Sequence, residues 1–401
     1  MVKIVESGII SKNPVPQLKA EQAVFPGLVQ LSEREFLCCY RKASAGEAVD
    51  ARYALTRSLD GGSTWQEEGL LWDPSKDERT YSYGYGYPSL LANGTLILSG
   101  YRWDRSVPER PIVYNPKTLG GVPCDTLLFR SADMGHTWSP PQVVPLPDGL
   151  IGNASGRVVP LSDGRLLLPV ETWKAYEDPA PPRQRSLALF SADGGLTWPE
   201  YSVAAMDPKH RLLYWNGMFS RMCDGRILVM YWVKDYETGE DLPIRGTYSE
   251  DDGKSWAEPF DTGIVGQMGS VVDLGDGRAF AAYNRRDARN PGVYGTISED
   301  GGKTWPQDGH LCIWDARGRA QIGSSEQEEC GLFDESLFAF GKPDVHRLPD
   351  GAVYVAHWAT HNFVTFIRWV RVSVGQRISA GGRDANRESA RNPLKVCAPS
   401  A

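Results

Sequence analysis

The chain has 401 residues, a formal net charge of −7, 13 Trp and 17 Tyr. This length suits two or three average domains or one large all-β domain, whose core would need no disulfide or metal. The sequence has no basic stripe of the kind that binds nucleic acid, and no run of about 20 apolar residues that could span a membrane.

The seven cysteines have no regular spacing, and their odd number argues against a disulfide framework or a zinc site. We therefore expect free thiols in a reducing compartment. The first 17 residues carry two Lys, one Glu and no apolar run of signal-peptide length. The sequence as written thus predicts a cytoplasmic protein, unless a signal lies outside it. It predicts no cofactor and no set of metal ligands.

An eight-residue pattern, Ser-x-Asp-x-Gly-x-Thr/Ser-Trp, occurs five times. The copies are residues 58–65, 131–138, 191–198, 249–256 and 298–305. The Asp side chain can accept backbone N–H bonds of its own turn, Gly supplies a positive φ, and the Thr or Ser hydroxyl closes the loop. We expect the Trp to pack between neighbouring sheets. Five copies predict a repeat fold.

A second repeat has the form apolar-x-turn pair-x-apolar and occurs six times. The copies are residues 31–36, 91–96, 161–166, 222–227, 274–279 and 348–353. Asn-Gly or Asp-Gly between apolar segments, found in five of them, is a strong signal for a β-hairpin. Five hairpins precede a Ser-x-Asp turn. Each unit therefore consists of strand, tight turn, strand, loop, strand, Ser-x-Asp turn and strand.

Six such units predict an all-β, six-bladed β-propeller with four antiparallel strands in each blade. The sixth unit has a hairpin and a third strand at residues 363–374, but it has no Ser-x-Asp turn. We expect the N-terminal residues 2–10 to supply its fourth strand and so to close the ring. The predicted propeller spans residues 1–374. Residues 375–401 are polar and without periodicity, which predicts a disordered tail.

Ser-x-Asp turns on a six-fold blade pattern resemble those of the sialidase (neuraminidase) superfamily of BNR-repeat, or Asp-box, proteins. The resemblance covers about residues 2–374. It implies the propeller fold, whereas activity depends on residues at the axis, away from the Asp boxes on the rim. Sialidases carry three Arg that clamp a carboxylate, a Tyr nucleophile paired with a Glu, and an Asp acid.

Most of these catalytic positions differ in this chain. The matching stretches are residues 24–27 (VFPG) for the first Arg, 214–217 (YWNG) for the Glu, 230–232 (MYW) for the second Arg and 341–344 (GKPD) for the Tyr. Arg289 competes with Arg285 and Arg286 for the third Arg. Asp50 is the counterpart of the Asp acid, because it follows Arg41 and precedes the third strand of the first unit. The resemblance therefore does not imply typical sialidase activity.

In a propeller, the starts of the innermost strands and the loops after the second strands meet at one end of the central channel. Ligand sites favour such funnels. The candidate catalytic carboxylates from these places are Asp50 and Glu171. The candidate substrate-binding residues are Arg41, Arg52, Tyr85, Arg157, Trp215, Asn216, Gln267, Arg285, Lys342 and His357.

Several candidates also fit a structural role. Tyr85 belongs to a Tyr-rich run at 81–87, which suits either a packed β edge or a sugar platform. Glu171 is either a rim residue or an axial acid, whose pKa burial would raise. Arg157 is either a ligand-binding residue or the salt-bridge partner of Glu171 or Asp50. His357 suits packing or the rim better than metal binding.

Three functions fit this inventory. Two carboxylates across a sugar-sized funnel permit glycoside hydrolysis, and Arg side chains suit an anionic sugar because they bind carboxylates in a bidentate manner. The first hypothesis is a glycoside hydrolase that acts on a terminal, anionic sugar. The second is a lyase on uronate glycans, with Tyr or His357 as the base. The third is a propeller that binds glycan or protein without catalysis.

Overall fold

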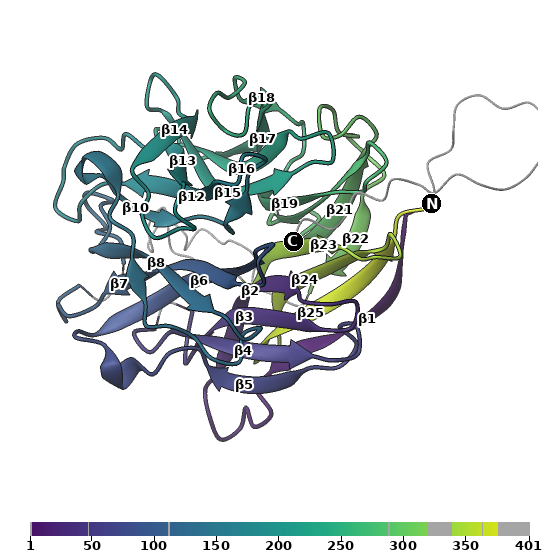
Figure 1. The fold of residues 1–401 in the computed structure, drawn as a ribbon, viewed down its shortest axis with the longest axis horizontal. Helices are drawn as coiled ribbons and strands as arrows, with labels where there is room; N and C mark the ends of the chain where they lie inside the picture. Colours follow the sequence, from purple (N-terminus) through teal and green to yellow (C-terminus); the bar gives the residue numbers. More distant parts are fainter. Residues whose placement is uncertain are drawn as a thin grey trace, which may run out of the picture.

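The computed structural model describes residues 2–46, 48–110, 113–287, 289–318, 339–362 and 364–375. These residues form six antiparallel sheets arranged as blades in a ring, which confirms the predicted six-bladed propeller (Figure 1). Helical structure within the described ranges is limited to two 3₁₀ turns, Pro74–Lys76 and Pro147–Gly149. No helix in these ranges is long and apolar enough to cross a membrane.

Each blade runs from an innermost strand at the axis to an outermost strand at the rim. Blade one has β2 (Gln22–Gln30), β3 (Phe36–Ala43), β4 (Arg52–Ser58) and β5 (Gln66–Leu70), and blade two has β6 (Tyr81–Leu90), β7 (Leu96–Asp104), β8 (Cys124–Ser131) and β9 (Gln142–Val143). Blade three has β10 (Ile151–Ala154) with β11 (Val159–Pro160), then β12 (Leu166–Trp173), β13 (Ser186–Ser191) and β14 (Glu200–Ala205). Blade four has β15 (Leu212–Arg221), β16 (Ile227–Asp235), β17 (Asp241–Ser249) and β18 (Phe260–Asp261). Blade five has β19 (Gln267–Asp273), β20 (Ala279–Arg285), β21 (Gly292–Ser298) and β22 (Leu311–Asp315).

Blade six is completed by the N-terminal strand, as the sequence predicts. Its order is β23 (Phe340–Arg347), β24 (Val353–His361), β25 (Val364–Ser373) and β1 (Lys3–Lys12). Figure 1 shows purple β1 along yellow β25, with which it pairs in antiparallel register. Innermost strands β23 and β2 also contact each other, so the two ends of the propeller are joined. The predicted tail lies outside the described residues from position 376 onward.

The Ser-x-Asp turns make the hydrogen bonds that the sequence predicts. In the first copy, Asp60 Oδ1 accepts the backbone N–H of Thr64 at 2.9 Å, and Oδ2 accepts the Thr64 hydroxyl at 2.6 Å. These bonds lower the pKa of Asp60 to about 2. The same two bonds recur in the other four copies. Trp65 packs against Phe36 of its own blade and donates to the hydroxyl of Tyr354 in blade six.

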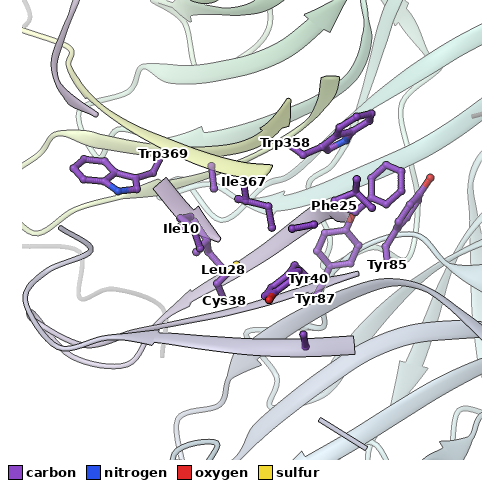
Figure 2. Packing of buried hydrophobic residues seen from close by; sticks show 14 of the residues in the cluster. Ile10, Phe25, Leu28, Cys38, Tyr40, Tyr85, Tyr87, Trp358, Ile367 and Trp369 are labelled. Atoms are coloured by element: carbon purple, nitrogen blue, oxygen red, sulfur yellow. The ribbon is translucent and has the colours of Figure 1, made fainter. Parts of the chain in front are cut away.

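The hydrophobic core is divided among the junctions between blades. Each pair of neighbouring blades encloses one apolar cluster of described residues. Figure 2 shows the cluster where blade six meets blade one, with Ile10 beside Leu28; Tyr85 and Tyr87 of blade two extend it toward the axis. Burial of large apolar side chains at every junction stabilises the ring by holding each sheet against the next.

The innermost strands share an irregularity that faces the axis. The pairing register shifts within β2, β6, β15, β19 and β23. In four of these shifts a residue other than Gly has a positive φ: Phe25 (56°), Asn216 (52°), Met268 (47°) and Lys342 (41°). In blade three the innermost strand is divided into β10 and β11. Such β-bulges redirect side chains and are common next to active sites.

Candidate functional site

Glu171 lies at the axial face, which we define as the end of the ring where the innermost strands begin and the second strands end. It is in β12, where Asn153 of β10 is its register partner. Glu171 Oε1 accepts from Asn153 Nδ2 at 3.0 Å, and Oε2 accepts the backbone N–H of Asn216 in blade four at 2.8 Å. Burial raises the pKa of the Glu171 carboxyl, although these hydrogen bonds and the charge of Lys342 lower it. A raised pKa suits a general acid.

Lys342 places its positive charge among residues of several blades at the axial face. It sits in the bulge of β23 and is 3% exposed. Its Nζ donates to Asn216 Oδ1 at 2.7 Å and lies 3.3 Å from the centroid of the Tyr85 ring. Its backbone N–H donates to Asn284 Oδ1 at 3.3 Å. Lys342 of blade six therefore contacts blades two, four and five.

Gln267 extends the polar side of the site into blade five. It begins β19, and its Oε1 accepts from Asn284 Nδ2 at 3.4 Å and from Arg286 Nη1. Arg286 also donates to the carbonyl oxygen of Phe340 in blade six at 2.6 Å. Asn216, Gln267, Lys342 and Glu171, all predicted from the sequence, thus belong to one hydrogen-bonded network.

Aromatic rings form an arc along the same face. Consecutive ring centroids are 4.4–6.4 Å apart. In order, the rings are Trp358, Phe25, Tyr85, Tyr101, Trp103, Tyr114, Trp173, Trp215 and Trp232. Figure 2 shows its first members, with Phe25 beside Tyr85 and Trp358. Trp173 and Trp215 are partly exposed, so they offer flat apolar surface to a ligand.

The sequence comparison is decisive for the family. A model described as a BNR repeat-like domain matches residues 113–355, which is more than half of the chain. This chain belongs to the BNR repeat-like domain family. The protein has the repeated turns and the blade order of the BNR/sialidase superfamily. No curated protein matches the chain in sequence.

Solved structures share the fold of this BNR repeat-like protein at low sequence identity. A protein of unknown function from Dyadobacter fermentans is 19% identical, with a TM-score of 0.72 over 93% of this chain and 99% of that one. The Hadza microbial sialidase Hz136 is 17% identical, with a TM-score of 0.60 over 87% and 65%. An α-L-arabinanase from Penicillium chrysogenum is 15% identical, with a TM-score of 0.59 over 92% and 98%. These similarities establish the fold that the protein shares with glycoside hydrolases.

Asp50 lies at the axial face but outside the network around Glu171. It is exposed in the loop between β3 and β4, where its Oδ1 accepts from the backbone N–H of Ser44 at 3.1 Å and from the Ser44 hydroxyl at 3.0 Å. No hydrogen bond or ion pair between described residues joins Asp50 to Glu171. Glu171 lies near the end of the second strand β12, and Asp50 follows the second strand β3, so both lie at the same end of the ring.

The structure gives Arg52, Arg157 and His357 partners that the sequence does not predict. Arg52 Nη1 donates to three backbone carbonyls, including that of Tyr81, so Arg52 supports the junction between blades one and two. Arg157 pairs with Asp344, so the predicted pairing with Glu171 or Asp50 is wrong. His357 is 0% exposed and packs against Trp314 of blade five, which keeps substrate from its ring.

The remaining candidates are held by their own neighbours. Arg285 pairs with Asp287. Arg41 is 3% exposed, with its guanidinium 5.8 Å from the centroid of the Phe25 ring. The Tyr residues of the 81–87 run are buried, which confirms the packed-strand alternative for them. Tyr85 still touches the site through Lys342. In the described ranges, no three His, Cys, Asp or Glu side chains lie close enough together to hold a metal ion.

A pocket of about 460 Å³ lies between blades two and three. Its walls include Cys124 and Asp125 of β8 and Gly152 of β10, the residue before Asn153. Tyr176 also lines it, with the guanidinium of Arg110 stacked 4.3 Å from the centroid of its ring. The size suits one or two sugar units, and the pocket adjoins the strand that orients Glu171.

Proposed function

We propose that this protein is a glycoside hydrolase that releases a terminal sugar at the axial face, with Glu171 as the general acid. The placement of Glu171 carries this proposal. Glu171 is partly buried, its two carboxyl oxygens are held by Asn153 and the Asn216 backbone, and burial raises its pKa. A carboxyl that is both oriented and easily protonated can donate a proton to a glycosidic oxygen.

The site favours a sugar with one apolar face and an anionic group. Trp173 and Trp215 supply partly exposed aromatic surface on one side. The partly exposed Arg286 and the buried Lys342 supply positive charge, which would stabilise the carboxylate of a uronic or ulosonic acid. The shared fold with a sialidase and an arabinanase supports a carbohydrate substrate.

The sequence predicts Asp50 of blade one as the second carboxylate, because its position resembles that of the sialidase acid. In the structure Asp50 is exposed and bonded to Ser44 of its own loop, outside the network that holds Glu171. The proposed function therefore rests on Glu171 alone. Residues 1–374 would then form the whole catalytic unit.

A substrate panel tests the proposed function. Purified protein is incubated with chromogenic glycosides of uronic acids, ulosonic acids, arabinose and neutral sugars, and with uronate oligomers. Hydrolysis of one of these glycosides, lost in Glu171→Gln, is the expected result. An unsaturated product with strong ultraviolet absorbance would instead identify a lyase. Binding of glycans without any product would identify a binding protein.

A further inference from the structure

A single buried chain of hydrogen bonds at the axial face has a carboxylate at each end. The chain starts at Glu171 and ends at Asp241, the first residue of β17. The residues between them are Asn216, Lys342, Asn284 and Gln267. These four residues are 0–7% exposed. Buried polar side chains are costly unless they are fully bonded, so a connected set of this kind fixes the groups at its ends.

Asp241 is held in the same way as Glu171. Its Oδ1 accepts from Trp232 Nε1 at 2.7 Å, and its Oδ2 accepts from Gln267 Nε2. The Nζ of Lys234 is 3.5 Å from Oδ1. The side chain of Asp241 nevertheless remains 37% exposed. An oriented carboxylate that solvent can reach is a feature of a prepared site, because rigid neighbours set its position before substrate binds.

The two carboxylates flank one pair of tryptophans. Trp215 and Trp232 are register partners in β15 and β16, with ring centroids 5.1 Å apart. The residue after Trp215 is Asn216, whose backbone binds Glu171, while the indole of Trp232 binds Asp241. Trp232 is 4% exposed, whereas Trp215 is partly exposed, so a sugar ring would stack on Trp215, with Glu171 and Asp241 on either side of the pair.

Asp50 lacks this setting, although it also lies next to the start of a third strand. Its Oδ1 is bonded within its own loop, to Ser44. The buried chain of hydrogen bonds from Glu171 reaches Asp241 rather than the loop of blade one.

We propose that Asp241 is the second catalytic carboxylate, a general base opposite Glu171. This rests on the proposed hydrolase function. Glu171 donates its proton to the glycosidic oxygen as the bond from that oxygen to the anomeric carbon breaks. Asp241 removes a proton from a water whose oxygen bonds to the anomeric carbon. One water is consumed, the leaving group departs as an alcohol, and solvent returns the proton from Asp241 to Glu171.

The position of Asp241 favours attack by water over direct attack by the carboxylate. Strand β16 separates β15, which contacts Glu171, from β17, which carries Asp241. Two strand spacings amount to about 10 Å between the backbones of β15 and β17, so the two carboxylates are held on separate strands and not side by side. Carboxylates about 6.5–9.5 Å apart leave room for a water and invert the anomeric centre, whereas a nucleophilic pair is about 5–5.5 Å apart. We expect the wider spacing, and with it inversion.

The test compares single variants on a glycoside that the wild-type protein cleaves. Asp241→Asn is expected to lower kcat by about 10²-fold or more, with KM and the urea unfolding midpoint little changed. Its pH–rate profile should lose the acidic limb. Asp224→Asn, in the hairpin at the opposite end of blade four, is the control and is expected to stay near wild type. Asp50→Asn distinguishes this assignment from the one that the sequence predicts. NMR of the first product should show the inverted anomer.

Chemical rescue of Asp241→Ala is a second test, because an added base would not restore activity if Asp241 had only a structural role. Formate, a small carboxylate base, should restore part of the activity of Asp241→Ala and none of that of Glu171→Gln. Near-normal kcat in Asp241→Asn, or a large loss in Asp50→Asn alone, would overturn the assignment while leaving the hydrolase function intact. A retained anomer would overturn the base role. If wild-type protein cleaves no glycoside, the proposed function fails, and the role of Asp241 fails with it.

Discussion

Arg157 of blade three donates two hydrogen bonds to the carboxylate of Asp344 in blade six, on the opposite side of the ring, at 2.7 and 2.8 Å. Asp344 is 1% exposed and also accepts the backbone N–H of Leu28 in blade one at 2.7 Å. One buried carboxylate thus connects three blades, two of which meet where the ring closes. Such a charge is tolerated only while its partner remains in place.

Arg157→Met is expected to lower the free energy of unfolding by about 3 kcal/mol, because Asp344 is left buried and charged. The double variant Arg157→Met/Asp344→Asn should recover a large part of this loss, since it removes the uncompensated charge. Urea unfolding followed by Trp fluorescence measures both. Arg317→Met, at an exposed ion pair, is the control and should change stability by less than about 0.5 kcal/mol. Strictly additive losses in the double variant would contradict the pairing.

His357 should make stability depend on pH. Burial lowers its pKa from 6.5 to about 4, so between these pH values the unfolded chain binds more protons than the folded protein. The stability linked to neutral His357 is therefore complete above pH 6.5 and is lost as the pH falls to 4, by about 3 kcal/mol in all. His357→Phe should flatten this part of the stability–pH curve, whereas His136→Asn, at an exposed site, should not. An unchanged slope in His357→Phe would contradict the burial argument.

The fold could be predicted because its signals lie within short stretches of sequence. The site could be predicted only in part, because its contacts join residues that are far apart in the chain. The turn at Ser58 and the Asp-Gly hairpins depend on hydrogen bonds within a few residues, so their sequence specifies them. The partner of Arg157 could not be predicted, because Asp344 is 187 residues away and meets it only in the closed ring. Tyr114 joins the aromatic arc from a loop that has no repeat pattern.

The sequence did contain a signal for Asp241, namely its position at the start of the third strand of a blade. Asp241 begins the third strand of blade four, and Asp50 lies just before the third strand of blade one. A search of that position in every unit would have included both residues. Choosing between them requires the contacts of Trp232 and Gln267, which only the folded structure provides.

Lys342 should set the pH range of catalysis through Glu171. If Glu171 acts as the protonated acid, activity falls as the pH rises through its pKa. Lys342→Met removes a charge that lowers this pKa, so the falling limb should move to higher pH. Glu171→Gln should lower kcat by about 10²-fold or more. The pH dependence of kcat/KM is the measurement, with Lys254→Met, at an exposed site, as the control. A limb that stays in place or moves to lower pH in Lys342→Met would contradict this role.

Gly27 should be required for the approach of blades one and two near the axis. A Cβ at Gly27 would lie 2.2 Å from the carbonyl oxygen of Gly86, a backbone atom that can move only with its whole strand. Gly27→Ala is therefore expected to cost about 2–3 kcal/mol of unfolding free energy. Gly94→Ala, in an open hairpin turn at a φ of +83°, should cost only about 1 kcal/mol, from backbone strain alone. Because Tyr85 precedes Gly86 and supports Lys342, Gly27→Ala should also lower kcat, whereas Gly94→Ala should not. Urea unfolding and kinetics of both variants provide the comparison, and equal stability losses would show that the two innermost strands separate easily.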